Sequence, residues 1–227
     1  MNAKGKFLLA GFVVVAFMSV SVRAQKVVPL APFNSVELRN GTHAILQHGA
    51  TQRVTLLKGS LDYTGVTIVD GGRLVVDRCK SECPRGYDLE IEIVTPDIAR
   101  VSIADGGWIQ SRGSFPRQAE MAVAVKDGGT IDIRSIPVGS VTASVYSGGR
   151  IFTRPLTAMS ASVVDGGLIT YWGDARVSKS IKGGGVVTRG TAAEAGQPLS
   201  DLSPRRESYV PPVPPVPPLQ PVRDPRR

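Results

Sequence analysis

Aliphatic and polar residues alternate on both sides of a two-glycine turn that recurs along the chain. Two positions before each turn, and four positions after its first residue, all twelve residues are aliphatic and eleven are β-branched. This alternation predicts strands, and the paired glycines predict tight bends because they accept positive φ. The turns are Asp70-Gly71-Gly72, Asp105-Gly106-Gly107, Asp127-Gly128-Gly129, Ser147-Gly148-Gly149, Asp165-Gly166-Gly167 and Gly183-Gly184-Gly185.

The spacing of these turns indicates a stacked repeat. From the second turn on, their first residues lie 22, 20, 18 and 18 positions apart. One strand–bend–strand unit cannot bury its own aliphatic face, whereas stacked copies can. We therefore predict an all-β, single-domain parallel β-solenoid of about 18–22 residues per repeat. The Asp or Ser that opens each turn is expected to accept a hydrogen bond from a backbone amide two residues on.

Composition shifts divide the chain into three parts. Residues 1–24 have a basic start, an apolar run and small residues at Ala24, which predicts a signal peptide and a mature chain that begins at Gln25. Residues 25–190 hold the repeats and form the predicted solenoid domain. Residues 191–227 form a Pro-rich tail, for which we expect extended polyproline II without a core. No segment after the signal peptide is long and apolar enough to span a membrane.

The charge of the chain favours acidic partners only mildly. The 227 residues carry a formal net charge of +8, of which residues 25–190 carry +4, with 19 basic and 15 acidic residues. This is not the dense basic stripe of a nucleic-acid-binding protein, so nucleic acid is not an expected partner. Hydrophobic residues make up 42% and aromatic residues only 6%, so aliphatic side chains must fill a narrow core.

Cys79 and Cys83 are the two cysteines of the chain. An exported protein can keep a disulfide, so we expect these residues to be bonded to each other. Two cysteines without a nearby histidine supply too few ligands for a closed zinc site, so no metal is expected.

Binding chemistry is expected on the outward positions after each turn. Positions are counted from the first residue of each turn, so that the third position lies three residues after it. This position holds Arg73, Trp108, Thr130, Arg150, Leu168 and Val186. We select Arg73, Trp108 and Arg150 as binding residues, because arginine pairs with carboxylates and phosphates and tryptophan offers an apolar face. The fifth position holds Val75, Gln110, Asp132, Phe152, Thr170 and Thr188 and is also expected to face outward.

A ridge formed by Asp105, Asp127 and Asp165 is the one arrangement that suggests catalysis. Clustered carboxylates serve glycoside hydrolysis or bind calcium. The Asp recurs in step with the glycines, however, as a turn former would. His43 and His48 have no recognisable partner nucleophile, and no phosphate loop or dinucleotide fingerprint occurs. We therefore expect no catalytic residue and no cofactor.

The repeat resembles the auto-transporter adhesin head family called the GIN domain, a domain of unknown function. The resemblance covers about residues 32–190, and its most specific part is the stretch from Ile169 to Val177 followed by Ile181 and the last glycine turn. Ala175 stands where the family has a proline, and the turns read Asp-Gly-Gly instead of Gly-Ser-Gly, as in a divergent member. The resemblance implies a parallel solenoid on exported bacterial proteins, with a presumed adhesive role and no catalytic residues.

Together these features predict an exported, non-catalytic binding or adhesin-like module in the periplasm or at the surface of a bacterium. The expected partner is an anionic glycan or an envelope lipid. The alternative is a carbohydrate-active solenoid enzyme, a hydrolase or lyase, that uses the Asp ridge. A groove of converging carboxylates and aromatic rings would favour the enzyme, and a flat, mixed surface would favour the binding module.

Overall fold

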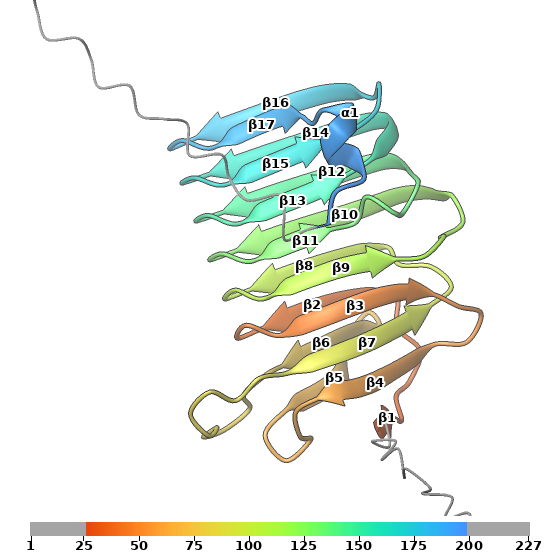
Figure 1. The fold of residues 1–227 in the computed structure, drawn as a ribbon, viewed down its shortest axis with the longest axis vertical. Coiled ribbons are helices and arrows are strands. Elements are labelled where there is room, and N and C mark those ends of the chain that lie inside the picture. The colour runs from red at the N-terminus through yellow and green to blue at the C-terminus, as the bar shows by residue number, and fades with distance from the viewer. Residues whose placement is uncertain (1–25, 199–227) are drawn as a thin grey trace, which may run out of the picture.

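The computed structural model describes residues 26–198, which form an all-β fold of two mixed sheets (Figure 1). The expected signal peptide and most of the Pro-rich tail lie outside these residues. In spatial order, the nine-stranded sheet contains β1 (Lys26–Val28), β4 (Arg53–Lys58), β7 (Glu90–Thr95), β3 (His43–His48), β9 (Trp108–Arg112), β11 (Thr130–Asp132), β13 (Arg150–Thr153), β15 (Leu168–Tyr171) and β17 (Val186–Arg189). The eight-stranded sheet contains β16 (Arg176–Lys182), β14 (Pro155–Val164), β12 (Val138–Tyr146), β10 (Gln118–Lys126), β8 (Arg100–Ala104), β2 (Ser35–Arg39), β6 (Arg73–Asp77) and β5 (Gly65–Val69).

The chain alternates between the sheets in strand–bend–strand units: β2–β3, β8–β9, β10–β11, β12–β13, β14–β15 and β16–β17. Each strand pairs in parallel with its counterpart in the next unit, so that Ile131 lies beside both Ile109 and Ile151. We call the connections inside units the bends and the returning connections the arcs. The arcs comprise residues 113–117, 133–137, 154 and 172–175. The repeat spacing in the sequence is therefore one unit.

The first two-glycine turn is not part of this series, which corrects the prediction. Asp70-Gly71-Gly72 joins β5 and β6, which pair antiparallel within one sheet. The bend of the first unit is instead Asn40-Gly41-Thr42, where Asn40 has φ 55°. Antiparallel pairs also link β1 to β4 and β4 to β7. Both turns need left-handed backbone, so the local pattern cannot distinguish a hairpin within one sheet from a bend between two sheets.

The bends place three successive residues in the left-handed region. Asp127 has φ 55°, Gly128 φ 89° and Gly129 φ 102°. A Cβ on Gly129 would lie 2.8 Å from Ile103 Cγ2, so this position also lacks space. The expected side-chain bond to an amide two residues on does not form at the Asp residues of the described bends. Asp is suited to this position because it tolerates the left-handed conformation. The bend is also held to the next unit by its backbone, since the amide of Asp127 donates to the Tyr146 carbonyl at 3.0 Å.

The core lies between the sheets and is filled by inward aliphatic side chains of both. One inward column runs through Val101, Val123, Ala143 and Ala161 and ends at Lys179. Lys179 Nζ donates to the Val187 carbonyl at 2.9 Å and lies 6.0 Å from the centre of the Tyr171 ring. An inward lysine at a sheet end discourages the addition of another strand.

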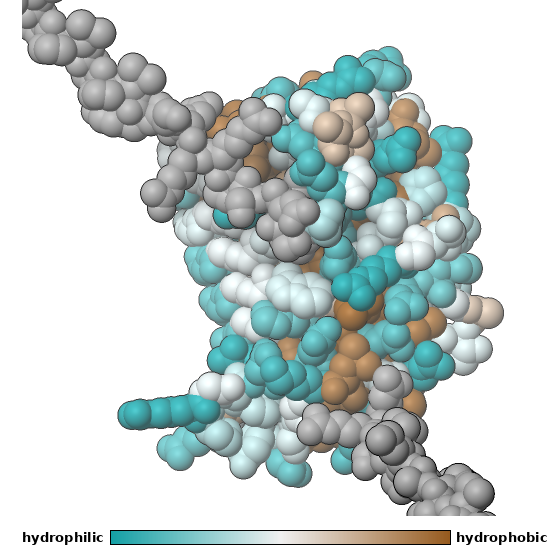
Figure 2. Space-filling model, in the orientation of Figure 1, coloured by the Kyte–Doolittle hydropathy of each residue, from teal (hydrophilic) through white to brown (hydrophobic). Residues whose placement is uncertain are grey.

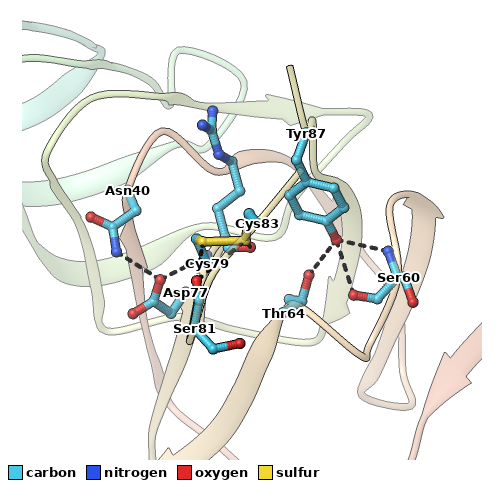
Figure 3. Close-up of a disulfide and its surroundings, with 9 residues drawn as sticks. Asn40, Ser60, Thr64, Asp77, Cys79, Ser81, Cys83 and Tyr87 are labelled. Atoms are coloured by element: carbon cyan, nitrogen blue, oxygen red, sulfur yellow. Dashed lines mark hydrogen bonds between the residues drawn. A yellow bond between two sulfur atoms is a disulfide. The ribbon is translucent and has the colours of Figure 1, made fainter. Parts of the chain in front are cut away.

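A loop between β6 and β7 contains the disulfide between Cys79 and Cys83 (Figure 3). Asp77 Oδ1 accepts hydrogen bonds from Asn40 Nδ2 at 2.7 Å and from the Cys79 amide at 3.0 Å. The Tyr87 hydroxyl accepts from the Ser60 amide at 2.7 Å. Side-chain bonds therefore hold this end of the molecule together, where the repeat is absent.

The C-terminal segment 190–198, which we call the strap, packs on the outer face of the nine-stranded sheet. It contains α1 (Ala192–Ala195), capped by Thr191. Arg134 forms a two-pronged ion pair with Asp132, and its guanidinium also donates to the carbonyls of Glu194, Ala195 and Gln197. Trp172 Nε1 donates to the Thr191 carbonyl at 2.8 Å. Residues 191–197, expected in a tail without a core, are thus fastened to the domain.

Candidate functional site

The structure brings two of the three selected binding residues onto one face. Trp108 and Arg150 both point outward from the nine-stranded sheet, with Thr130 between them on β11. Arg73 lies on the other sheet, where its Nη1 is 3.0 Å from Glu37 Oε2. Arg73 is displaced because its turn is the β5–β6 hairpin. His43 takes the corresponding position, since the bend before it is the true first bend.

The side chains of His43 and Trp108 stack on neighbouring strands. Their ring centres are 5.1 Å apart and their planes differ by 17°. His43 Nδ1 lies 3.5 Å from Asp88 Oδ1, and Lys58 Nζ lies 2.6 Å from Asp88 Oδ2. The hydrogen bond from Lys58 holds the pKa of Asp88 below its ordinary value, and burial opposes this shift. Asp88 is therefore a carboxylate at neutral pH and is neutralised by Lys58.

We call His43, Trp108, Thr130 and Arg150 the aromatic–basic row. Because adjacent strands lie about 4.8 Å apart, Trp108 and Arg150 are about 10 Å apart along the row. Arg150 forms no ion pair within residues 26–198. Stacked rings, a hydroxyl and an unneutralised guanidinium thus follow one another on rigid strands. Figure 2 shows this face as mostly hydrophilic or neutral, with hydrophobic area gathered over the lower strands.

The outward fifth position differs from its prediction. Asp132 and Phe152 are buried, with 3% of each exposed, because the strap and Arg134 cover them. The Arg134 guanidinium lies 5.1 Å from the centre of the Trp172 ring and 5.8 Å from that of Phe152. Trp172 lies on the outer side of the core, under the strap. These side chains serve to attach the strap.

The Asp ridge runs along the bends at the margin of the molecule (Figure 1). Lys126 Nζ lies 3.5 Å from Asp127 Oδ2. A Cβ on Gly183 would lie 2.3 Å from Asp165 Oδ1, so that carboxylate packs against the next bend. Ser147 separates Asp127 from Asp165 along the ridge. Within residues 26–198, no group of three or more His, Cys, Asp or Glu side chains is placed to hold a metal ion.

A groove lies elsewhere, on the outer face of the eight-stranded sheet. It has a volume of about 460 Å³ and crosses β12, β14 and β16. Arg176 is its one charged lining residue, and hydroxyls line the rest together with Ala158, Met159, Val141 and Val177. Sequence reasoning missed this groove because outward Ser and Thr in a strand resemble ordinary solvated surface. In the part of the chain from 26 to 198, no helix is long and apolar enough to cross a membrane.

Comparisons with known proteins do not assign a family. No protein-family model matches the chain, and no curated protein does either. Among solved structures, a "putative adhesin" from Bacteroides fragilis NCTC 9343 is 16% identical, with 73% of this chain and 94% of that chain covered and a TM-score of 0.42. A "putative lipid binding protein" from Parabacteroides distasonis ATCC 8503 is 13% identical, covering 74% and 96%, with a TM-score of 0.39. A "putative cell adhesion protein" from Clostridium sporogenes ATCC 15579 is 10% identical, covering 73% and 97%, with a TM-score of 0.36. Likenesses at this level assign neither a family nor a ligand.

Proposed function

We propose that this protein is an exported, non-catalytic binding module of a bacterial envelope or cell surface, built as a divergent GIN-like parallel β-solenoid. Its ligand is an anionic glycan or envelope lipid. The observation that carries the proposal is the aromatic–basic row, where Trp108 and Arg150 flank Thr130 on adjacent strands. The parallel pairing from β8 to β17 supports the solenoid part of the proposal.

The row has the chemistry that an anionic ligand requires. A guanidinium binds carboxylate, sulfate or phosphate oxygens through two parallel N–H bonds. Arg150 is available for this because no carboxylate of residues 26–198 pairs with it. The stacked rings of His43 and Trp108 offer an apolar edge for sugar carbons or acyl chains. Since the residues stand on paired strands, binding orders little backbone, which lowers its entropic cost.

The enzyme alternative relies on the Asp ridge. Glycosidases place two carboxylates on opposite sides of a bound sugar. Here the Asp residues occupy the outer side of the bends, and the groove lining contains no carboxylate. This arrangement favours a turn-forming role for the ridge and a binding role for the module.

The test compares two double variants of the mature chain. Trp108→Ala/Arg150→Ala removes the row's aromatic ring and cation. Lys126→Ala/Tyr146→Ala is the matched control, because it removes a neighbouring cation and exposed ring from the other sheet. Binding to polygalacturonate and to vesicles that contain phosphatidylglycerol is measured at low and high salt. Loss of a charged hydrogen bond costs about 1.5–3 kcal/mol, so the row variant should bind at least about tenfold more weakly.

Two results would count against the proposal. Equal binding by the parent and the row variant would remove the row from the function. Release of sugar fragments from polygalacturonate with time would instead support the enzyme alternative and direct attention to Asp105, Asp127 and Asp165. Binding by the parent must weaken with salt, because the attraction between the arginine and the anion is screened.

A further inference from the structure

Arginines recur on the arcs and at the strand ends that flank them, much as Asp recurs on the bends. Seven residues after the first residue of the bend, three consecutive units have an arginine: Arg112, Arg134 and Arg154. Arg117 and Arg176 add a guanidinium on two further arc ends. Arg134 is mostly covered by the strap, with 11% of its side chain exposed, whereas the other four are exposed. The two long margins of the molecule therefore differ in charge.

The exposed arc arginines are not neutralised from within the protein. In residues 26–198, Arg117, Arg154 and Arg176 form neither an ion pair nor a side-chain hydrogen bond. The acidic residues close to them in the chain are Glu120 and Asp174. Asp174 is already bound by Arg189. By contrast, Lys126 on the bend side lies 3.5 Å from the ridge residue Asp127.

Strand register sets the spacing of these guanidinium groups. Gln118 and Pro155 both pair with Val138, so the preceding residues, Arg117 and Arg154, lie two strands apart, about 10 Å along the stack. Arg176 is on the next strand, beside Ala158. Ala158 pairs with Ser140 and Ser140 with Glu120, so Arg176 is offset along the strands by about three residues, about 10 Å, from Arg117. The three cations therefore form a staggered line across the stack. Such a line suits a chain molecule with repeated negative charges.

The groove continues this line of cations onto the outer face of the eight-stranded sheet. Arg176 stands at its rim, and four hydroxyls line it, those of Ser140, Thr142, Ser160 and Ser178. Thr142, Ser160 and Ser178 are direct neighbours on three adjacent strands. Hydroxyls both donate and accept hydrogen bonds, as sugar hydroxyls do. Its small side chains also leave the volume of about 460 Å³ open for a sugar ring.

We infer that the arc margin and this groove form a second binding surface, for an extended anionic polysaccharide. Carboxylate or sulfate groups of the polymer bind Arg117, Arg154 and Arg176, and its ring hydroxyls bind the Ser and Thr residues of the groove. The groove lining contains no aromatic ring on which a nucleobase could stack, which favours a polysaccharide over single-stranded nucleic acid. This surface shares no residue with the aromatic–basic row, so the two proposals can fail separately.

The test neutralises the arc arginines in the mature chain. Arg117→Gln/Arg154→Gln/Arg176→Gln removes three charges from the arc margin. The matched control, Arg85→Gln/Lys126→Gln/Lys182→Gln, removes three exposed charges elsewhere. Binding to polygalacturonate is measured by calorimetry at several salt concentrations, with neutral dextran and single-stranded DNA as further probes. We expect the arc variant to lose at least tenfold in affinity and to show a smaller salt dependence, and the control to stay within about threefold.

A second variant tests the groove without changing the charge. Ser160→Ala/Ser178→Ala should weaken binding to polygalacturonate several-fold while the salt dependence stays that of the parent. Unchanged affinity would overturn the assignment of the groove. Equal losses in the arc variant and the charge control, or DNA binding as tight as polygalacturonate binding, would overturn the polysaccharide surface. Binding lost in Trp108→Ala/Arg150→Ala but kept in the arc variant would support the row and reject the arc margin.

Discussion

The two ends of the molecule are stabilised in different ways. From β8 to β17, each unit repeats the one before it, and parallel pairing between identical positions extends both sheets. Before β8, the strands pair out of sequence order: β2 lies between β8 and β6, and β3 lies between β9 and β7. This N-terminal region is held by antiparallel pairs, the disulfide and side-chain hydrogen bonds around Asp77 and Tyr87 (Figure 3).

The charge of the two regions differs as well. Residues 26–98 contain 8 basic and 9 acidic residues, a net charge of −1, whereas residues 99–189 contain 11 basic and 6 acidic residues, a net charge of +5. In the N-terminal region four of the eight basic residues form ion pairs, among them Arg73 with Glu37 and Lys58 with Asp88. The comparison teaches that the regular repeat is stabilised by its own strand pairing, and its surface residues Arg117, Arg150, Arg154 and Arg176 form no ion pair within residues 26–198.

The largest effect is expected from valines at Gly128 and Gly129 in a regular bend. Both positions have positive φ, and a side chain at Gly129 meets Ile103 and the bend below. The double variant should lose several kcal/mol of unfolding free energy and fail to fold cooperatively.

Two control variants should be milder. Gly71→Val in the hairpin should cost less stability, because no atom lies within 4 Å of its added Cβ. Asp127→Asn should stay within about 0.5 kcal/mol, since Asn also accepts this conformation. Urea unfolding measures all three; equal stability of the double variant and the parent would contradict the account of the bends.

Arg134→Ala is expected to have the next largest effect. It leaves the Asp132 carboxylate, 3% exposed, without its partner and releases the strap. Removing one partner of a buried ion pair costs about 3–5 kcal/mol. Arg154→Ala, the same position in the next unit and exposed, should change stability by less than about 0.5 kcal/mol. Thermal melting and Trp172 fluorescence measure the result, and similar melting of the two variants would show that the strap contributes little.

Removing the disulfide should have a smaller and local effect. Cys79→Ser/Cys83→Ser opens a short loop in the N-terminal region, so the entropic loss is about 2 kcal/mol or less. Hydrogen exchange should quicken in β5, β6 and the following loop and stay unchanged from β10 to β17. Faster exchange throughout the stack would mean that the two regions unfold as one unit. Titration of the denatured, non-reduced parent should find no free thiol.

The smallest effect is the pH dependence of the Lys58–Asp88 pair. The pKa of Asp88 is lowered in the folded state, so the stabilisation is present above the ordinary pKa near 3.8 and disappears as the pH falls through the folded value. Because both side chains are partly exposed, the effect is small. Melting temperatures of the parent and Asp88→Asn should differ slightly at pH 7 and converge only when the pH falls below the ordinary pKa and through the lower folded value. A difference that is the same at pH 7 and at the lowest pH at which both proteins still fold would contradict this assignment.

The sequence by itself determined what depends on local backbone preference. The β-branched alternation identified the strands from β8 to β17, and the glycine pairs identified their bends, because positive φ and period two are properties of a few neighbouring residues. The nearness of Cys79 and Cys83 likewise made their pairing predictable.

Only the tertiary structure decided which segments became neighbours. It placed Arg73 in a hairpin of the eight-stranded sheet and gave its expected position to His43. It also brought the strap onto Arg134, which buried Phe152, and aligned Thr142, Ser160 and Ser178 into a groove. These contacts join residues far apart in the chain. The same local pattern fits several partners, and the burial of a shared core selects among them.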